Sequence, residues 1–147
     1  MAKLTLGQAV RNCITVEKAA ERFYRNLAAE TKEEGVKAFL VDMAGQEREH
    51  AAAIEKFGQE QAARLPTYAD RELEIVEAAP GWAEVEDLSL EQAFDVAIEC
   101  EGHAALYYDI IADQTEGDVS KFYRMLSKTE EKHIENLQER RAGMQAS

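Results

Sequence analysis

Two segments of the chain carry a glutamate three residues ahead of a histidine: Glu47 with His50, and Glu130 with His133. Residues three apart on a helix lie on the same face, so each pair can offer a carboxylate and an imidazole to one metal ion. The chain contains three His, and two of them stand in this arrangement. The spacing therefore indicates a site that binds metal.

Both pairs interrupt stripes of apolar residues that recur at helical spacing. The residues of these stripes are Leu40, Met43, Ala44, Ala51, Ile54 and Phe57 around the first pair, and Phe122, Leu126 and Leu137 around the second. A carboxylate in a buried face is costly unless a cation or hydrogen bonds compensate its charge. A solvated helix face gives no reason for such placement, so we expect both pairs to be buried and to bind metal.

Four long helices must position these residues. The apolar pattern predicts helices over about 6–31, 36–61, 90–115 and 119–141, and the last residues, 142–147, are expected to fray. A crossover over about 62–88 holds both prolines, and it is long enough to hold a short amphipathic helix around 68–76 and to start the third helix parallel to the second. Capping boxes, Thr5 with Gln8 and Ser89 with Gln92, begin the first and third helices. The expected fold is one all-α domain over 1–147, a four-helix bundle of two antiparallel hairpins.

The second half of the chain repeats the first. A shift of about 84 residues places the third helix on the first and the fourth on the second. The matching pairs are Glu17 and Glu101, Tyr24 and Tyr108, Glu47 and Glu130, and His50 and His133. A duplicated hairpin explains why apolar core positions recur, but it gives no reason for Glu, Tyr and His to recur at buried positions. The four acids and two imidazoles are therefore expected to converge at mid-depth in the bundle.

The charge of this cluster fits two divalent cations. Four carboxylates cancel four positive charges, and a neutral cluster can be held in a core of low dielectric constant. One glutamate from each of two helices, with a Glu-x-x-His from each of the other two, is the ligand set of di-iron and di-manganese bundles. A structural zinc site would be closed and richer in Cys. We expect two Fe ions, and Mn or a mixed pair is also compatible with these ligands.

At these residues the chain resembles the rubrerythrin branch of the ferritin-like superfamily. Gln46-Glu47-Arg48-Glu49-His50 looks like the family's Gln-Glu-x-Glu-His, and Glu130-Glu131-Lys132-His133 looks like its Glu-Glu-x-His. The resemblance covers about residues 5–141 and implies a ferritin-like bundle.

The resemblance also implies roles for the site residues. Glu47 and Glu130 would bridge the two metals, Glu17 and Glu101 would be terminal ligands, and His50 and His133 would each bind one metal. Tyr24 and Tyr108, the candidate catalytic residues, would hydrogen-bond to carboxylate ligands. The alternative for each tyrosine is core packing, with its hydroxyl group satisfied elsewhere.

The chain departs from the family pattern in two ways. Typical rubrerythrins append a rubredoxin domain, but Cys13 and Cys100 lie in separate helical segments and cannot build its iron site. We interpret them as core residues in a reducing compartment. Many members also carry an extra Glu one turn after the acid of the third helix, where this chain has Ala104, so the metal-shifting mechanism of the family is not implied. His103 turns away from the predicted site and is expected at the surface or at an interface.

Composition limits the partners. The net charge of −12 argues against nucleic acid, which requires a basic surface, and it favours the attraction of cations. The chain of 147 residues contains no apolar run long enough to span a membrane and no secretory segment at its start, so a cytoplasmic location without membrane contact is expected. A homodimer is expected from the resemblance, and the long crossover would permit exchange of hairpins between subunits.

Three functions are compatible with this reading. The first is a di-iron oxidoreductase that reduces hydrogen peroxide or dioxygen with electrons from an external donor, such as a separate rubredoxin or a reductase. The second is iron oxidation and storage, which would need a hollow shell of many subunits. The long crossover and the lack of a recognisable fifth helix after Arg141 weigh against storage. The third is a bundle that binds metal without turnover.

Overall fold

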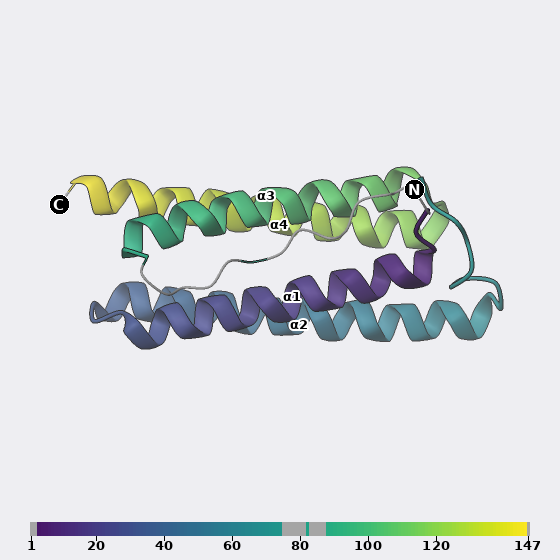
Figure 1. Cartoon of the computed structure of the whole chain (residues 1–147), viewed down its shortest axis with the longest axis horizontal. Coiled ribbons are helices and arrows are strands. Elements are labelled where there is room, and N and C mark those ends of the chain that lie inside the picture. The colour runs from purple at the N-terminus through teal and green to yellow at the C-terminus, as the bar shows by residue number, and fades with distance from the viewer. Residues whose placement is uncertain (1–2, 75–81, 83–87, 147) are drawn as a thin grey trace.

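The fold is a bundle of four long helices, described here from a computed structural model over residues 3–74, 82 and 88–146. The helices are α1 (Leu6–Glu30), α2 (Glu34–Arg64), α3 (Leu90–Asp113) and α4 (Gly117–Ala146), and these described ranges contain no strand (Figure 1). The all-α architecture predicted from the sequence is confirmed. Among the described residues, no helix has the combination of length and apolar character that crossing a bilayer requires.

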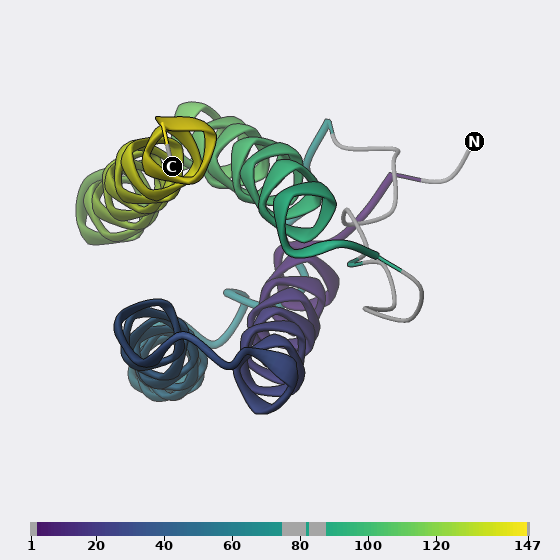
Figure 2. The same ribbon diagram turned by 90° about the vertical axis from the view of Figure 1, so that its left-hand side faces the viewer.

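The helices pair as two antiparallel hairpins, α1 with α2 and α3 with α4 (Figures 1 and 2). Figure 1 shows that α2 ends at the opposite end of the bundle from the start of α3, so these two helices run parallel, as the length of the crossover predicted. Viewed end-on, α1 faces α3 and α2 faces α4 (Figure 2). This arrangement turns one face of every helix toward a common interior.

Both predicted capping boxes are present. The hydroxyl groups of Thr5 and Ser89 accept from the backbone N–H groups of Gln8 and Gln92, whose side-chain oxygens accept from the backbone N–H groups of Thr5 and Ser89 in return. These reciprocal bonds satisfy donors that the first helical turn leaves without partners. They fix where α1 and α3 begin, and therefore the height of Glu17 and Glu101 in the bundle.

Two local predictions were wrong. The expected fraying from residue 142 is not found, because α4 continues to Ala146 and Met144 packs against the apolar core; Ser147 lies outside the described residues. The described part of the expected helix around 68–76 is also not helical. That segment pairs with the N-terminus instead: the N–H of Leu6 donates to the carbonyl of Arg71 at 2.7 Å, and the N–H of Leu73 donates to the carbonyl of Leu4 at 2.8 Å. Positions 75 and 76 lie outside the described residues.

The core consists of two apolar clusters separated along the bundle axis. On each helix, the predicted glutamate falls between residues of one cluster and residues of the other. The flanking residues are Val16 and Ala20 in α1, Ala44 and Ile54 in α2, Ala97 and Ala104 in α3, and Leu126 and Leu137 in α4. Burial of these apolar clusters stabilises the bundle. It also places the four acids at one level, enclosed by hydrocarbon at both ends.

Candidate metal centre

All six residues singled out by spacing meet in the middle of the bundle. Glu17 comes from α1, Glu47 and His50 from α2, Glu101 from α3, and Glu130 and His133 from α4. The four glutamates and His133 are at most 1% exposed, whereas the His50 side chain is 14% exposed. The centre is thus closed to solvent except beside His50.

The ligand atoms form two groups, within each of which all atoms lie within 4.8 Å of one another. The first group is Glu17, Glu47, His50 and Glu130, and the second is Glu47, Glu101, Glu130 and His133. Glu47 and Glu130 belong to both groups. Two cations placed side by side would thus share these two carboxylates, with one further acid and one imidazole for each ion. This is the geometry that bridging roles for Glu47 and Glu130 require.

Several buried ligand atoms have no hydrogen-bond partner in the part of the chain that the structure describes. They are Glu17 Oε2, Glu47 Oε1, Glu101 Oε2, Glu130 Oε2 and His133 Nδ1. Buried polar atoms in folded proteins are nearly always satisfied, so five orphaned ligand atoms in one cluster need a cause. His133 Nδ1 lies 2.8 Å from Glu47 Oε1 without forming a hydrogen bond. Lone pairs directed at a common cation account for these atoms, and the donor set therefore fits two divalent metals.

Without metal, burial and neighbouring charges raise the pKa values of two ligands, Glu47 and His50. Burial, together with the nearby charges of Glu130 and Glu17, raises the pKa of Glu47 well above its ordinary value. Burial alone would lower the pKa of His50, but its hydrogen bond to Glu130 and the nearby negative charge of Glu17 raise that pKa to about 10. Burial would likewise raise the pKa of Glu130, but His133 and His50 outweigh it and lower that pKa. Metal binding must therefore displace protons from Glu47 and His50.

The two tyrosines hold the terminal acids in a crosswise pattern. The hydroxyl group of Tyr24 on α1 donates to Glu101 Oε1 on α3 at 2.8 Å, and the hydroxyl group of Tyr108 on α3 donates to Glu17 Oε1 on α1. Burial is the main cause that raises the pKa of both phenols, so both remain protonated donors. Each tyrosine occupies one oxygen of its carboxylate and leaves the other, Oε2, directed toward the metal position.

Sequence reasoning gave no role to Gln46, although it stands in the recognised motif. Its Nε2 donates to Asp42 Oδ2 at 2.7 Å, which turns its Oε1 toward His133 Nε2 at 2.8 Å. His133 Nε2 therefore donates to Gln46 Oε1, which leaves Nδ1 as the nitrogen that can bind a metal. The internal repeat could not reveal this role, because the position equivalent to Gln46 is Thr129.

The two halves of the centre consequently differ. The Thr129 hydroxyl group donates to the carbonyl of Met125 at 3.0 Å, within its own helix, and does not reach His50. His50 is also the ligand with solvent exposure, although its ring stacks on that of His133 with centroids 5.3 Å apart. The His133 position is therefore the more rigid of the two, and the His50 position is the more accessible.

A Gln46→Leu variant is expected to weaken the binding of one of two metal ions by about 10- to 100-fold, the usual cost of losing a partner that orients a ligand. The reason is that His133 loses the acceptor that fixes its tautomer and ring orientation. Titration of the metal-free protein with Co(II), followed by absorbance, measures both affinities. Thr129→Val, at the equivalent position of the other half, is the control and should leave both affinities near wild type. Equal effects of the two substitutions would contradict this role for Gln46.

Three residues set aside by sequence reasoning also lie outside the centre. Cys13 and Cys100 are buried, are not joined in a disulfide, and belong to neither ligand group. His103 is exposed, as expected for a residue turned away from the site. Ala104, where many rubrerythrins have a further Glu, is buried in the apolar cluster that contains Val16, Ile54 and Leu126.

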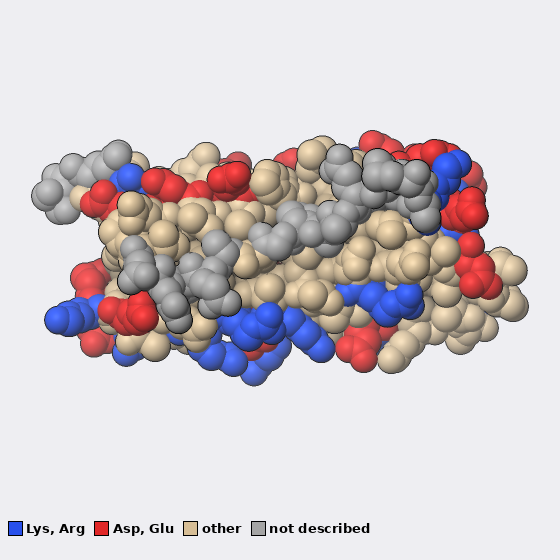
Figure 3. Space-filling model, in the orientation of Figure 1, with Lys and Arg blue, Asp and Glu red and all other residues tan. Residues whose placement is uncertain are grey.

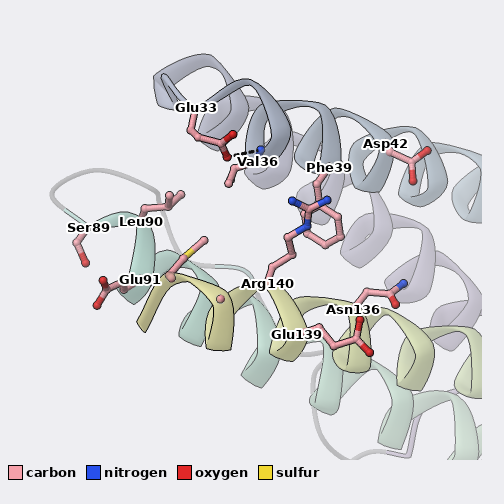
Figure 4. A pocket seen from close by; sticks show the side chains of 12 residues that line it. Glu33, Val36, Phe39, Asp42, Ser89, Leu90, Glu91, Asn136, Glu139 and Arg140 are labelled. Atoms are coloured by element: carbon pink, nitrogen blue, oxygen red, sulfur yellow. Dashed lines mark hydrogen bonds between the residues drawn. The ribbon is translucent and has the colours of Figure 1, made fainter. Parts of the chain in front are cut away.

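A large cleft in the described structure lies away from the centre. It has a volume of about 1070 Å³ and lies where α4 ends, close to the beginnings of α2 and α3. Arg140 extends from α4 across this cleft and places its guanidinium 5.0 Å from the ring centroid of Phe39 on α2 (Figure 4). None of the six predicted ligands lines it. This cleft is therefore separate from the candidate metal centre.

Comparison with known proteins agrees with this geometry. The family model described as Rubrerythrin matches residues 9–139. A crystal structure of a candidate ferritin-like diiron-carboxylate protein from Thermotoga maritima superimposes with a TM-score of 0.79 at 22% sequence identity, and the match covers 97% of each chain. At this identity the likeness shows the fold alone. No curated protein matches the chain significantly.

Proposed function

Because the chain belongs to the rubrerythrin family, we propose that it is a di-iron oxidoreductase that reduces hydrogen peroxide, or dioxygen, with electrons from an external donor. The observation that supports this most directly is the pair of ligand groups that share Glu47 and Glu130. Two metal ions held side by side can exchange two electrons with one substrate. A site for a single ion would not need the shared carboxylates.

The ligand set favours iron over zinc. Carboxylate and imidazole ligands that leave coordination positions open suit Fe(II), and Mn(II) is compatible with the same set. When bound, a ferrous pair supplies two electrons and Lewis acidity to an oxygen substrate. Reduction of one hydrogen peroxide consumes those two electrons and two protons and yields two waters. The external donor then returns two electrons.

The chain's own residues orient and protect this reaction. Tyr24 and Tyr108 keep protons on their hydroxyl groups and fix Glu101 and Glu17 so that one oxygen of each faces the metal position. The apolar clusters at both ends keep water from the buried carboxylates. His50 has 14% of its side chain exposed, so a small substrate reaches the centre most directly on that side.

Peroxide oxidation of the reduced, iron-loaded protein tests the proposal. The anaerobic protein, with two Fe(II) per chain, is mixed with hydrogen peroxide in a stopped-flow instrument, and ferric absorbance is recorded. We expect one peroxide to oxidise two Fe(II), and Glu49→Gln, which removes an exposed acid beside the centre, should react at the wild-type rate. A Glu47→Ala variant, lacking a shared ligand, should react about 100-fold more slowly or worse. No difference between these two variants would refute the proposal.

The same experiment separates the rival functions. Iron storage requires ferric iron to be retained well beyond two ions per chain, within a large assembly seen by sizing chromatography. A bundle that only binds metal would hold two ions without rapid oxidation by peroxide or dioxygen. The cytoplasmic location and the homodimer expected from the sequence stay predictions.

A further inference from the structure

The outer face of α1 carries a stripe of cations on a strongly acidic protein. The four members, Arg11, Lys18, Arg22 and Arg25, follow one another at helical spacing and are all exposed; together they are called the basic stripe. Figure 3 shows one face of the whole molecule. Lys and Arg side chains gather along its lower part, where α1 lies in Figure 1, and Asp and Glu side chains lie along its upper edge. The whole chain has a net charge of −12. The basic stripe is therefore a local exception to the overall charge.

Most of these cations are not neutralised by neighbouring acids. Within the described ranges, Arg25 pairs with Glu21, whereas Arg11, Lys18 and Arg22 make no ion pair. Thr15, which is exposed between Arg11 and Lys18, carries no charge that could neutralise them. Free cations in a row create a positive potential that attracts a negatively charged partner and accelerates its approach.

The basic stripe lies directly outside the metal centre. Glu17, one of the predicted ligands, is on the inward side of α1, and Lys18 is the next residue. An α-helix with its side chains is about 10–12 Å thick, so a protein bound to the stripe lies roughly one helix diameter from the centre. The stripe runs about 21 Å from Arg11 to Arg25 at 1.5 Å per residue. That length suits the small interface of a transient electron-transfer complex.

We propose that the basic stripe is the docking surface for a small acidic protein that carries one electron at a time. This inference rests on the proposed function, which requires an external donor. Each docked carrier loses one electron to the centre and leaves oxidised, so two successive dockings restore the two electrons that one peroxide consumes. A nucleic acid is disfavoured as the occupant because the overall charge of −12 repels an extended phosphate backbone.

Charge reversal on two helices tests the docking site. Lys18→Glu with Arg22→Glu alters the basic stripe, and Lys121→Glu with Lys128→Glu alters exposed lysines on α4. Both double variants change the net charge by the same amount, so general repulsion is matched. The probe is a purified acidic rubredoxin. Its dissociation constant is measured by calorimetry with the iron-loaded protein, and the rate at which it reduces the oxidised centre is followed from 20 to 300 mM salt.

The stripe variant should bind rubredoxin and accept its electrons at least about 10-fold less well at low salt, and the wild-type rate should fall as salt rises. The α4 variant should stay within about 2-fold of wild type. Equal losses in both variants, or no loss in either, would overturn the proposal. So would a dimer, seen by sizing chromatography, that the stripe variant alone abolishes, because the occupant would then be a second copy of this chain.

A small-molecule reductant separates failure of docking from failure of the proposed function. Photoreduced flavin can recharge the centre without the basic stripe. Suppose that the flavin-reduced protein reacts rapidly with peroxide, but the stripe variant binds rubredoxin as tightly as the wild type. The docking proposal is then wrong and the oxidoreductase proposal stands. If rubredoxin binding depends on the stripe but peroxide fails to oxidise the centre, the surface is correct and the peroxide reaction is wrong.

Discussion

A Glu47→Gln variant is expected to lose tight binding of both metal ions while its metal-free form becomes more stable than the wild type. Glu47 belongs to both ligand groups, and an uncharged amide is a poor substitute for a shared carboxylate. Without metal, burial and the charges of Glu130 and Glu17 raise the pKa of Glu47, so folding disfavours the charged form of this acid. Glutamine imitates the protonated form and removes that cost.

Both the loss of metal affinity and the gain in metal-free stability should be large enough to measure. The affinity for each of the two metals should fall by about 100-fold or more, since even partners that only orient ligands contribute 10- to 100-fold. The free energy of unfolding of the metal-free variant should rise by about 1–2 kcal/mol, or roughly 2–8 °C in melting temperature for a chain of this size. Calorimetric metal titration and thermal unfolding in the presence of chelator measure the two quantities.

Glu130→Gln is the matched comparison, since Glu130 is the other shared acid. It should also lose both metals, but without metal it should not be stabilised. The pKa of Glu130 is lowered because His133 and His50 outweigh its burial, so its negative charge is compensated in the metal-free protein. Stabilisation of both variants, or of neither, would contradict this account of the charges.

Removal of metal from the wild-type protein is expected to lower its melting temperature strongly. A ligand that binds only the folded state stabilises it by about 4 kcal/mol when present at 1,000 times its dissociation constant, and two sites contribute separately. At roughly 2–4 °C per kcal/mol, the two ions should raise the melting temperature by about 15–30 °C. Unfolding scans of iron- or manganese-loaded protein, with and without chelator, measure the difference. An unchanged melting temperature would favour a scaffold that needs no metal.

The effect of metal should grow as pH rises. The raised pKa of Glu47 gives the metal-free fold a stability contribution that is complete below about 4.5 and is lost as pH rises. The raised pKa of His50 gives a second stability contribution, which is complete below pH 6.5 and is lost as pH rises toward 10. The lowered pKa of Glu130 acts in the opposite direction, but only as pH falls below about 4.5. The free energy of unfolding of the metal-free protein should therefore fall as pH rises from 5.5 to 8.5.

Metal affinity should rise over the same range, because the protons on Glu47 and His50 no longer compete with the ions. Calorimetric titrations in buffers of different ionisation enthalpy count the protons released for each metal bound. Proton release is expected for the wild-type protein because Glu47 and His50 both have raised pKa values without metal. Affinity that is independent of pH would show that the ligands are already free of protons.

The sequence alone determined the helices and the residues that face the interior. The capping boxes at Thr5 and Ser89 and the apolar stripes depend on contacts three or four residues apart, and such spacings are visible in a linear chain. The repeat of Glu17, Glu47 and His50 in the second half identified the convergent set for the same reason. The rubrerythrin resemblance rested on these residues, and the family match confirms it.

Only the tertiary structure decided what depends on contacts between distant segments. Tyr24 reaches Glu101 across 77 positions, and Gln46 reaches His133 across 87, so local spacing carried no signal of either bond. The segment after α2 pairs with the N-terminus although its own pattern favoured a helix, because backbone groups around Leu4 and Leu6 offered it partners. Packing of the hairpins also buries His133 and leaves His50 partly exposed. The order of residues fixed the ligand types, and the packing of four helices fixed how each ligand is held and which one meets solvent.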